Sequence, residues 1–403
     1  MKNKNLMNMK CFDFHCQGES HKAARKVCQD YSYSHSNENG DVVAIVCDGH
    51  GGERYFRSDV GAKLATKITS ENVEFFLEHV DKSLFVGLPY SSCPARQFAI
   101  NPIDKIFRQL FSSVISCWKI AISDHAQNTP ISEYEKEHVG QKYLAEFSQG
   151  GCLEKTYGCT LIAYVQTSRF WFAFQIGDGK CISFDFDGNS KEPIPWDDRC
   201  FLNETTSMCD IGALDNFRYC YCGDGTFPVA VFLGSDGVDV SFGEEHNLVN
   251  FYTNVINHLA TKGLLEVESE IVEDLPELSR RGSKDDMSLA FVYDENGVSH
   301  VYDLWNNDRI KDVVPVQDVT PEIAMEQGPS RVDEEVVKGV DSQKPIVCVE
   351  PIDVVPNTTE DHSGGIKPQC GVFVAVVRIL KRLRLLFLNV KGLIDYVRRK
   401  NKT

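Results

Sequence analysis

The chain has 403 residues, of which 42% are hydrophobic and 25% charged, enough for one large domain with appended segments. Its formal net charge of −16 argues against a general nucleic-acid-binding role. Residues 1–11 lack the apolar centre of a secretory signal. The sequence contains no run of 18 uncharged apolar residues, so we expect no transmembrane helix. We therefore expect a cytoplasmic protein with reduced cysteines.

Apolar runs and helical spacings of apolar residues occupy most of the first 295 residues. Strands are predicted at 41–48, 159–177, 181–186, 217–222, 229–235 and 288–293. Helices are predicted at 55–65, at 103–118 after a proline suited to a first helical position, and at 247–264. Strands and helices that are segregated in this way indicate an α+β fold. Residues 85–100 and 126–157 are interpreted as loops or insertions.

The most informative motif is Asp48-Gly49-His50-Gly51-Gly52, which follows the apolar run 42–47. A strand that ends in this way places an acid, a titratable base and an open backbone at one strand end. Glycine allows the backbone to approach an ion or a ligand closely. By itself the pentapeptide is a weak signal, because Asp-Gly pairs are common in turns.

Further acids stand next to apolar runs. Asp30 precedes the motif, Asp178 and Asp236 each follow a predicted strand, and Asp285 precedes the last one. Carboxylates gathered at strand ends repel one another unless cations neutralise them. Hard oxygen ligands without paired His or Cys favour Mg²⁺ or Mn²⁺ over Zn²⁺.

In this order the motifs resemble the metal-dependent protein serine/threonine phosphatases of the PP2C-like family, and more narrowly a bacterial-type branch with a Cys-Gln-Asp opening. The resemblance covers roughly residues 10–295. It implies two antiparallel β-sheets packed as a sandwich, with α-helices outside and metal ions at one edge. The ordered set of motifs is more specific than any single member.

The resemblance also implies roles for individual residues. Asp30 would bind one metal ion, Asp48 would bridge two, and the Gly49 carbonyl would add a backbone ligand. Asp236 and Asp285 would bind the other ion, and Asp178 would belong to a looser third site. His50 would be the general acid for the leaving group, and Arg25 would grip the phosphate.

Some positions depart from the family pattern. Gln29 stands where many members have Glu, and Asp286 stands where many have Asn. Asp178-Gly179 lacks the Ser-Arg that usually follows the acid. His21 is an alternative to Arg25 as the phosphate contact. None of these departures removes a metal-binding carboxylate.

The implied activity is hydrolysis of phosphoserine and phosphothreonine in proteins by a water that bridges two metal ions. Two such metal ions lower the pKa of the water that they share. Electrostatic stabilisation of the transition state then contributes most of the remaining catalysis. An alternative is a catalytically silent phosphatase-like module that senses or scaffolds a partner. Another is hydrolysis of a small phosphorylated metabolite. The complete carboxylate set favours an active enzyme.

The C-terminal hundred residues are organised differently. Residues 296–365 are interpreted as an acidic, flexible linker. Residues 366–403 contain ten Lys and Arg against the single acid Asp395, and their apolar residues recur at helical spacing. Such a basic amphipathic helix suits an anionic membrane surface, a groove of a partner protein, or the acidic domain of its own chain.

Overall fold

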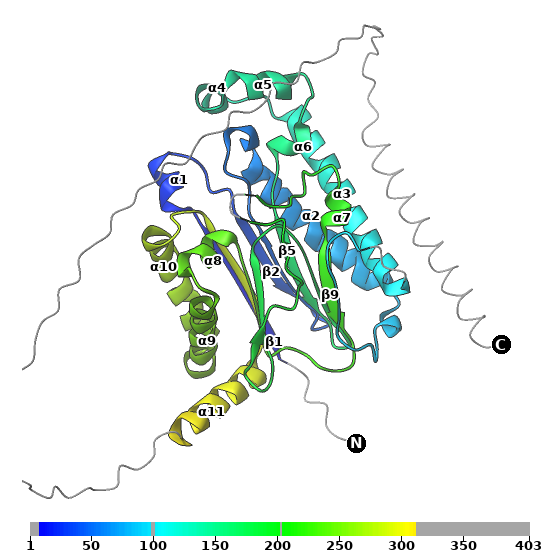
Figure 1. The fold of residues 1–403 in the computed structure, drawn as a ribbon, viewed down its shortest axis with the longest axis vertical. Helices are drawn as coiled ribbons and strands as arrows, with labels where there is room; N and C mark the ends of the chain where they lie inside the picture. The colour runs from blue at the N-terminus through cyan, green and yellow to red at the C-terminus, as the bar shows by residue number, and fades with distance from the viewer. Residues whose placement is uncertain (1–7, 98–100, 202–203, 312–403) are drawn as a thin grey trace, which may run out of the picture. The chain divides into compact units, whose positions relative to one another are not determined.

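The computed structural model describes residues 8–97, 101–201 and 204–311 (Figure 1). Two antiparallel sheets pack face to face, and helices cover their outer faces. The predicted α+β sandwich is therefore confirmed.

One sheet has five strands in the order β1-β11-β10-β7-β8, and the other has six in the order β2-β3-β5-β6-β9-β4. All paired strands are antiparallel. The strands of the first sheet are β1 Met9–Cys16, β7 Lys180–Phe184, β8 Ser190–Lys191, β10 Ala230–Gly234 and β11 Met287–Asp294. Those of the second are β2 Tyr31–Ser36, β3 Val42–Cys47, β4 Ser91–Cys93, β5 Leu161–Gln166, β6 Trp171–Ile176 and β9 Arg218–Cys222.

Two long helices cover the six-stranded sheet, and the helices of the C-terminal half cover the five-stranded one (Figure 1). The first group and the segments next to it are α2 Ser58–His79, α3 Pro102–Asn128, α4 Glu133–His138, α5 Gln141–Ser148, α6 Leu153–Thr156 and α7 Ala213–Asn216. The second group is α8 Asp236–Phe242, α9 Glu245–Lys262, α10 Leu264–Arg281 and α11 Glu295–Lys311. Helix α1 Glu19–Ala23 lies against the second group. Short 3₁₀ turns lie at Glu53–Tyr55 and Lys82–Leu84.

Strand β3 shows how the sequence builds the layers. All six of its residues are buried, because β3 lies between β2 and β5. Side chains alternate along a strand, so Val43 and Ile45 pack in the core under α2 and α3, whereas Val42, Ala44 and Val46 pack in the core between the sheets. The Asp48 motif therefore begins where a rigid central strand ends.

The predicted strands are confirmed with shifts of one or two residues at their ends, and the predicted run 159–177 forms two strands, β5 and β6. Strands β1, β2, β4 and β8 are not among the predicted ones, and the serines of β2 show why an apolar pattern alone misses such a strand. In the structure, Ser32 and Ser34 donate hydrogen bonds to Asp13 of the neighbouring β1, at 3.1 and 2.8 Å. These bonds satisfy polar groups on a face that the sequence gives no reason to bury.

The interpretation of 126–157 as a loop is wrong, because this segment contains the end of α3 and helices α4, α5 and α6. The buried Arg57 anchors it. Its guanidinium donates to the Glu135 carboxylate and to the Thr129 carbonyl, and it lies 4.9 Å from the ring centre of Phe147. These contacts join residues far apart in sequence, so local patterns could not reveal them.

The predicted linker also begins too early, because α11 continues to Lys311 with Val298 and Val301 fully buried. The rest of that linker and the basic segment 366–403 lie outside the described residues. Within the described part of the chain, no helix combines the length and apolarity needed to cross a bilayer.

Candidate active site

A cavity of about 530 Å³ lies at the sandwich edge where the acidic strand ends meet. Asp48 follows β3, Asp178 lies in the turn between β6 and β7, and Asp236 begins α8. Asp30 and Asp285 also line this cavity. The structure thus brings together all five predicted metal carboxylates, which span more than 250 residues of sequence. The acids that line the cavity are Asp30, Asp48, Asp178, Glu204, Asp210, Asp236, Asp285 and Asp286.

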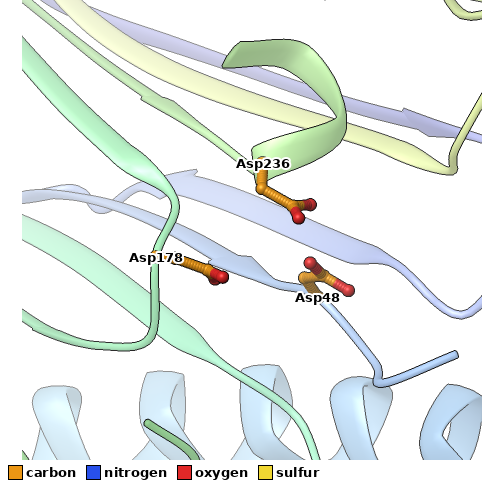
Figure 2. Close-up of side chains that lie close together, drawn as sticks. All are labelled: Asp48, Asp178 and Asp236. Atoms are coloured by element: carbon orange, nitrogen blue, oxygen red, sulfur yellow. The ribbon is translucent and has the colours of Figure 1, made fainter. Parts of the chain in front are cut away.

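Three of these carboxylates form the centre of the site. One oxygen each of Asp48, Asp178 and Asp236 lies within 4.8 Å of the other two, and Figure 2 shows the three groups turned toward a common space. This cluster contains only carboxylates, a donor set that suits Mg²⁺ or Mn²⁺ better than a soft metal. The residues therefore fit the hard cations expected from the sequence.

Glycines and a threonine set the position of Asp48. The Asp48 N–H donates to Thr160 Oγ1 at 3.1 Å, and the Thr160 N–H donates to the Asp48 carbonyl at 2.7 Å. A Cβ at position 49 would lie 2.5 Å from the Gln29 carbonyl oxygen, so only glycine allows this close approach. Gly49 lines the cavity, as a backbone ligand must.

Burial and mutual repulsion disturb the titration of the acidic cluster. Burial, followed by the charge of Asp30, raises the pKa of Asp48 well above its usual range. Burial also raises the pKa of Asp178, and it raises that of Asp236 to about 6. Burial and the neighbouring negative charges favour the protonated forms more than in a free aspartate. Divalent ions at this position would reverse the preference.

Asp30 and Asp285 differ in how deeply they are buried. Asp30 is buried and accepts a hydrogen bond from Ser288 Oγ at 2.7 Å. Burial and the charge of Asp286 raise the pKa of Asp30 to about 8. Asp285 is exposed, with 55% of its side chain accessible. The carboxylates of the site thus run from the protein interior to its surface.

His50 lies in the cavity wall, but its ring is engaged elsewhere. Its Nε2 lies 2.7 Å from Ser207 Oγ, and the Ser207 hydroxyl donates to the Cys159 carbonyl. Because that hydroxyl has one proton, we assign the Nε2–H of His50 as the donor to Ser207. Burial lowers the pKa of His50 to about 4, so the ring is neutral at pH 7.

His21 also lines the cavity, in a contrasting environment. Its Nδ1–H donates to Asp286 Oδ2 at 2.8 Å, and its Nε2 lies 4.0 Å from Asp285 Oδ1. The hydrogen bond to Asp286 raises the pKa of His21. Asp286, at the position of the family Asn, also accepts the Gly18 and Gln29 N–H groups, and so joins the segment before Asp30 to β11.

The structure does not bring Arg25 to this site. Arg25 is exposed, is not among the residues that line the cavity, and contributes its carbonyl to a hydrogen bond from Tyr134 at 2.8 Å. Between the two phosphate contacts that the sequence suggests, His21 is the one that lines the cavity.

Sequence reasoning missed a cation. Lys155, at the end of α6, is the only Lys or Arg among the residues that line the described cavity, and its Nζ lies 3.3 Å from Asp210 Oδ1. It stands three residues before Gly158, where a lone lysine carries no signal. Its place in the cavity depends on Asp210, which is 55 residues away in the sequence.

A model of the protein phosphatase 2C family matches residues 17–275, more than half of the chain. The chain belongs to this family. No curated protein sequence matches the chain.

Several solved structures are similar to this protein phosphatase 2C domain. Serine/threonine phosphatase Stp1 from Staphylococcus aureus is 12% identical, with a TM-score of 0.41 over 73% of this chain and 97% of that one. The S. agalactiae serine/threonine phosphatase is 15% identical, with a TM-score of 0.40 over 71% and 99%. PppA from Pseudomonas aeruginosa, a regulatory component of T6SS, is 14% identical, with a TM-score of 0.40 over 71% and 97%.

Proposed function

We propose that this protein phosphatase 2C family member is a metal-dependent hydrolase of phosphoserine and phosphothreonine in proteins. The observation that carries the proposal is the cluster of Asp48, Asp178 and Asp236, whose oxygens converge in a cavity at the sandwich edge. Gathering three carboxylates in this way is unfavourable without cations, so the cluster supports a metal site. The family match supports phosphate hydrolysis as the chemistry of that site.

We assign the metal ligands as follows. Asp30, Asp48 and the Gly49 carbonyl would hold one Mg²⁺ or Mn²⁺, and Asp48, Asp236 and Asp285 would hold a second. Asp178 would contribute to a third, looser site. When bound, the ions would lower the pKa of a shared water toward neutrality and so supply the nucleophile.

The chain's own residues would handle the charge of the substrate. Lys155 would attract the phosphate, since it is the one permanent cation among the residues that line the described cavity. His50 would protonate the leaving serine or threonine oxygen. Its ring is neutral in the free protein, and the negative charge of a bound phosphate would favour its protonated form.

A protein substrate agrees with the shape of the site. The exposed Asp285 and Glu204 lie at the cavity rim, so the cavity opens at the surface and a phosphorylated side chain can enter from outside. We also propose that the enzyme acts in the cytoplasm and that residues 366–403 direct it to an anionic membrane surface or to a partner protein. Deleting 366–403 should then change location or partner binding, measured by fractionation or pull-down, more than turnover of a small substrate.

Hydrolysis of p-nitrophenyl phosphate and of a phosphothreonine peptide tests the main proposal. The full chain should release phosphate from both with Mn²⁺ or Mg²⁺ and not with chelator, and Asp48→Asn should lose this activity while staying folded by circular dichroism. If wild type and Asp48→Asn turn over equally, this cavity is not the active site. If well-folded wild-type protein is inactive with either metal, the enzyme proposal fails.

A further inference from the structure

A second hollow adjoins the active-site cavity. It has a volume of about 510 Å³, and residues of α7 form part of its lining. We call it the arginine cleft. The residues that line it are Arg96, Arg199, Thr206, Asp210, Gly212, Asp215 and Asn216.

The cavity and the arginine cleft share one wall, the segment from Thr205 to Asp210. Thr205, Ser207 and Asp210 face the cavity, whereas Thr206 and Asp210 line the cleft. Thr206 Oγ1 also accepts a hydrogen bond from the Gly177 N–H at 3.0 Å, directly before the carboxylate Asp178. A peptide that places its phosphate in the cavity can therefore continue over Asp210 into the cleft.

The acids of the arginine cleft already have cationic partners. Asp210 pairs with Lys155 at 3.3 Å, and Asp215 pairs with Arg108 at 2.5 Å. Because each carboxylate is already paired with a cation, it attracts a further cation only weakly. The cleft is therefore not a second acidic site, unlike the cavity beside it.

The arginines of the arginine cleft differ in how far their charge is satisfied. Arg199 donates from Nε and Nη2 to Asp197 at 2.9 and 2.7 Å, and from Nη1 to Asn216 at 2.5 Å, so its guanidinium is held in place. Arg96 is exposed, and among the described residues its side chain forms no ion pair. Its backbone N–H donates to the Asp215 carbonyl at 2.7 Å. Arg96 thus has an anchored backbone and a guanidinium that no ion pair with a described residue neutralises.

The rim of the arginine cleft also presents an apolar side chain. Ile211 lies between two cleft residues, Asp210 and Gly212, and its side chain is fully exposed. An arginine beside an exposed apolar group is a composition typical of the contact points of protein interfaces. The cleft therefore suits a peptide segment better than a free small anion.

We propose that the arginine cleft docks an anionic side chain, either a carboxylate or a second phosphate, that lies near the scissile phosphate of the phosphoprotein substrate. Arg96 would be the main contact. This inference rests on the proposed phosphatase function and narrows its substrates to phosphorylation sites with an acidic neighbour. Charge-assisted hydrogen bonds to a guanidinium favour carboxylates and phosphates alike.

Matched peptides test this proposal with the full chain and Mn²⁺. Three phosphothreonine peptides would carry alanine, glutamate or phosphoserine at a flanking position, scanned on both sides, with a lysine peptide as the opposite charge. For wild type we expect kcat/KM to be about fivefold higher with glutamate than with alanine at the best position, the size of a partly exposed ion pair. A comparison of kcat/KM for the phosphoserine and glutamate peptides shows whether the cleft prefers a second phosphate or a carboxylate.

Charge reversal makes the test specific. Arg96→Glu should reverse the ranking, so that the lysine peptide becomes better than the glutamate peptide. Lys119→Glu is the control, because Lys119 is a partly exposed cation, 3.5 Å from Glu154, that lines neither hollow. It should keep the wild-type ranking. An unchanged ranking in Arg96→Glu, or an equal loss for all peptides, would overturn the proposal.

The two proposals fail in different ways. Hydrolysis of p-nitrophenyl phosphate without any preference among the peptides would overturn the docking site and leave the phosphatase intact. If no substrate is hydrolysed, the phosphatase proposal fails. Fluorescence anisotropy with the same peptides, labelled, then still tests whether the arginine cleft binds anionic side chains. Tighter binding of glutamate or phosphoserine peptides that is lost in Arg96→Glu would support it, and equal binding of all peptides would overturn it.

Discussion

The active-site cavity has two walls of different origin. The carboxylate wall consists of Asp30, Asp48, Asp178, Asp236 and Asp285, which stand at or next to strand ends of the sandwich. The opposing wall consists of His50, Lys155, Ser207 and Asp210, which come from loops and from the short helix α6. The first wall repeats one chemical group, whereas the second contains mutually satisfied pairs.

The difference shows that local environment, and not residue type, sets the charge of each group. Asp210 and Asp236 are both half-buried acids of one cavity. Asp210 is neutralised by Lys155, whereas burial raises the pKa of Asp236 to about 6. Likewise, the pKa of His50 is lowered by burial and that of His21 is raised by Asp286. We therefore expect mutations in the two walls to have unequal effects.

The largest difference in metal-dependent kcat/KM should be between the variants Asp236→Asn and Asp210→Asn. Loss of a metal ligand should lower metal-dependent kcat/KM by roughly a thousandfold or more, the scale of a major electrostatic contribution to catalysis. Loss of the partner of Lys155 should cost roughly tenfold or less, because no reacting group is removed. Steady-state kinetics with p-nitrophenyl phosphate and Mn²⁺ measure both. Equal losses would erase the distinction between the walls.

A smaller effect should follow from His50→Gln. If His50 protonates the leaving oxygen, the variant should lose about a hundredfold in kcat on a phosphothreonine peptide, within the range typical of general acid catalysis. It should lose much less on p-nitrophenyl phosphate, whose phenolate leaves without a proton. The ratio of the two losses measures how much His50 contributes as a general acid. Similar losses on both substrates would show that His50 has only a structural role.

Lys155→Met should raise KM by about tenfold with a smaller change in kcat, because a charge-assisted contact with the phosphate is removed. Lys155→Arg should retain part of the affinity. Lys119→Met serves as the control, since Lys119 makes a comparable ion pair outside the cavity. A normal KM for phosphate-containing substrates in Lys155→Met would show that another group attracts the phosphate.

The smallest effect concerns stability without metal. Burial raises the pKa values of Asp30 and Asp236 to about 8 and about 6, above the value of about 3.9 in an unfolded chain. The folded state thus holds more protons, so stability should fall as the pH rises from about 4 to 8. A melting temperature that falls over this range in chelator, by about 2–4 °C per kcal/mol, and is restored by Mn²⁺ would confirm the acidic cluster. A flat profile would contradict it.

The carboxylate wall could be predicted from the sequence because strand ends leave local signals. An apolar run shows where β3 or β10 ends, and the next acid is then at a sheet edge. The opposing wall leaves no such signal. Lys155 and Asp210 meet across 55 residues, and helices α4 to α6 depend on the buried Arg57 for their attachment.

By itself, the sequence determined the main strands and the acids at their ends, because side-chain periodicity and the residues that end a strand are local properties. The sandwich was expected only through the family resemblance that the order of these motifs carries. Only the tertiary structure decided which acids meet at the centre of the site, that Arg25 stays outside the cavity, and that Lys155 enters it. Burial, hydrogen bonding and charge pairing depend on residues distant in sequence, so they are settled only when the chain has folded.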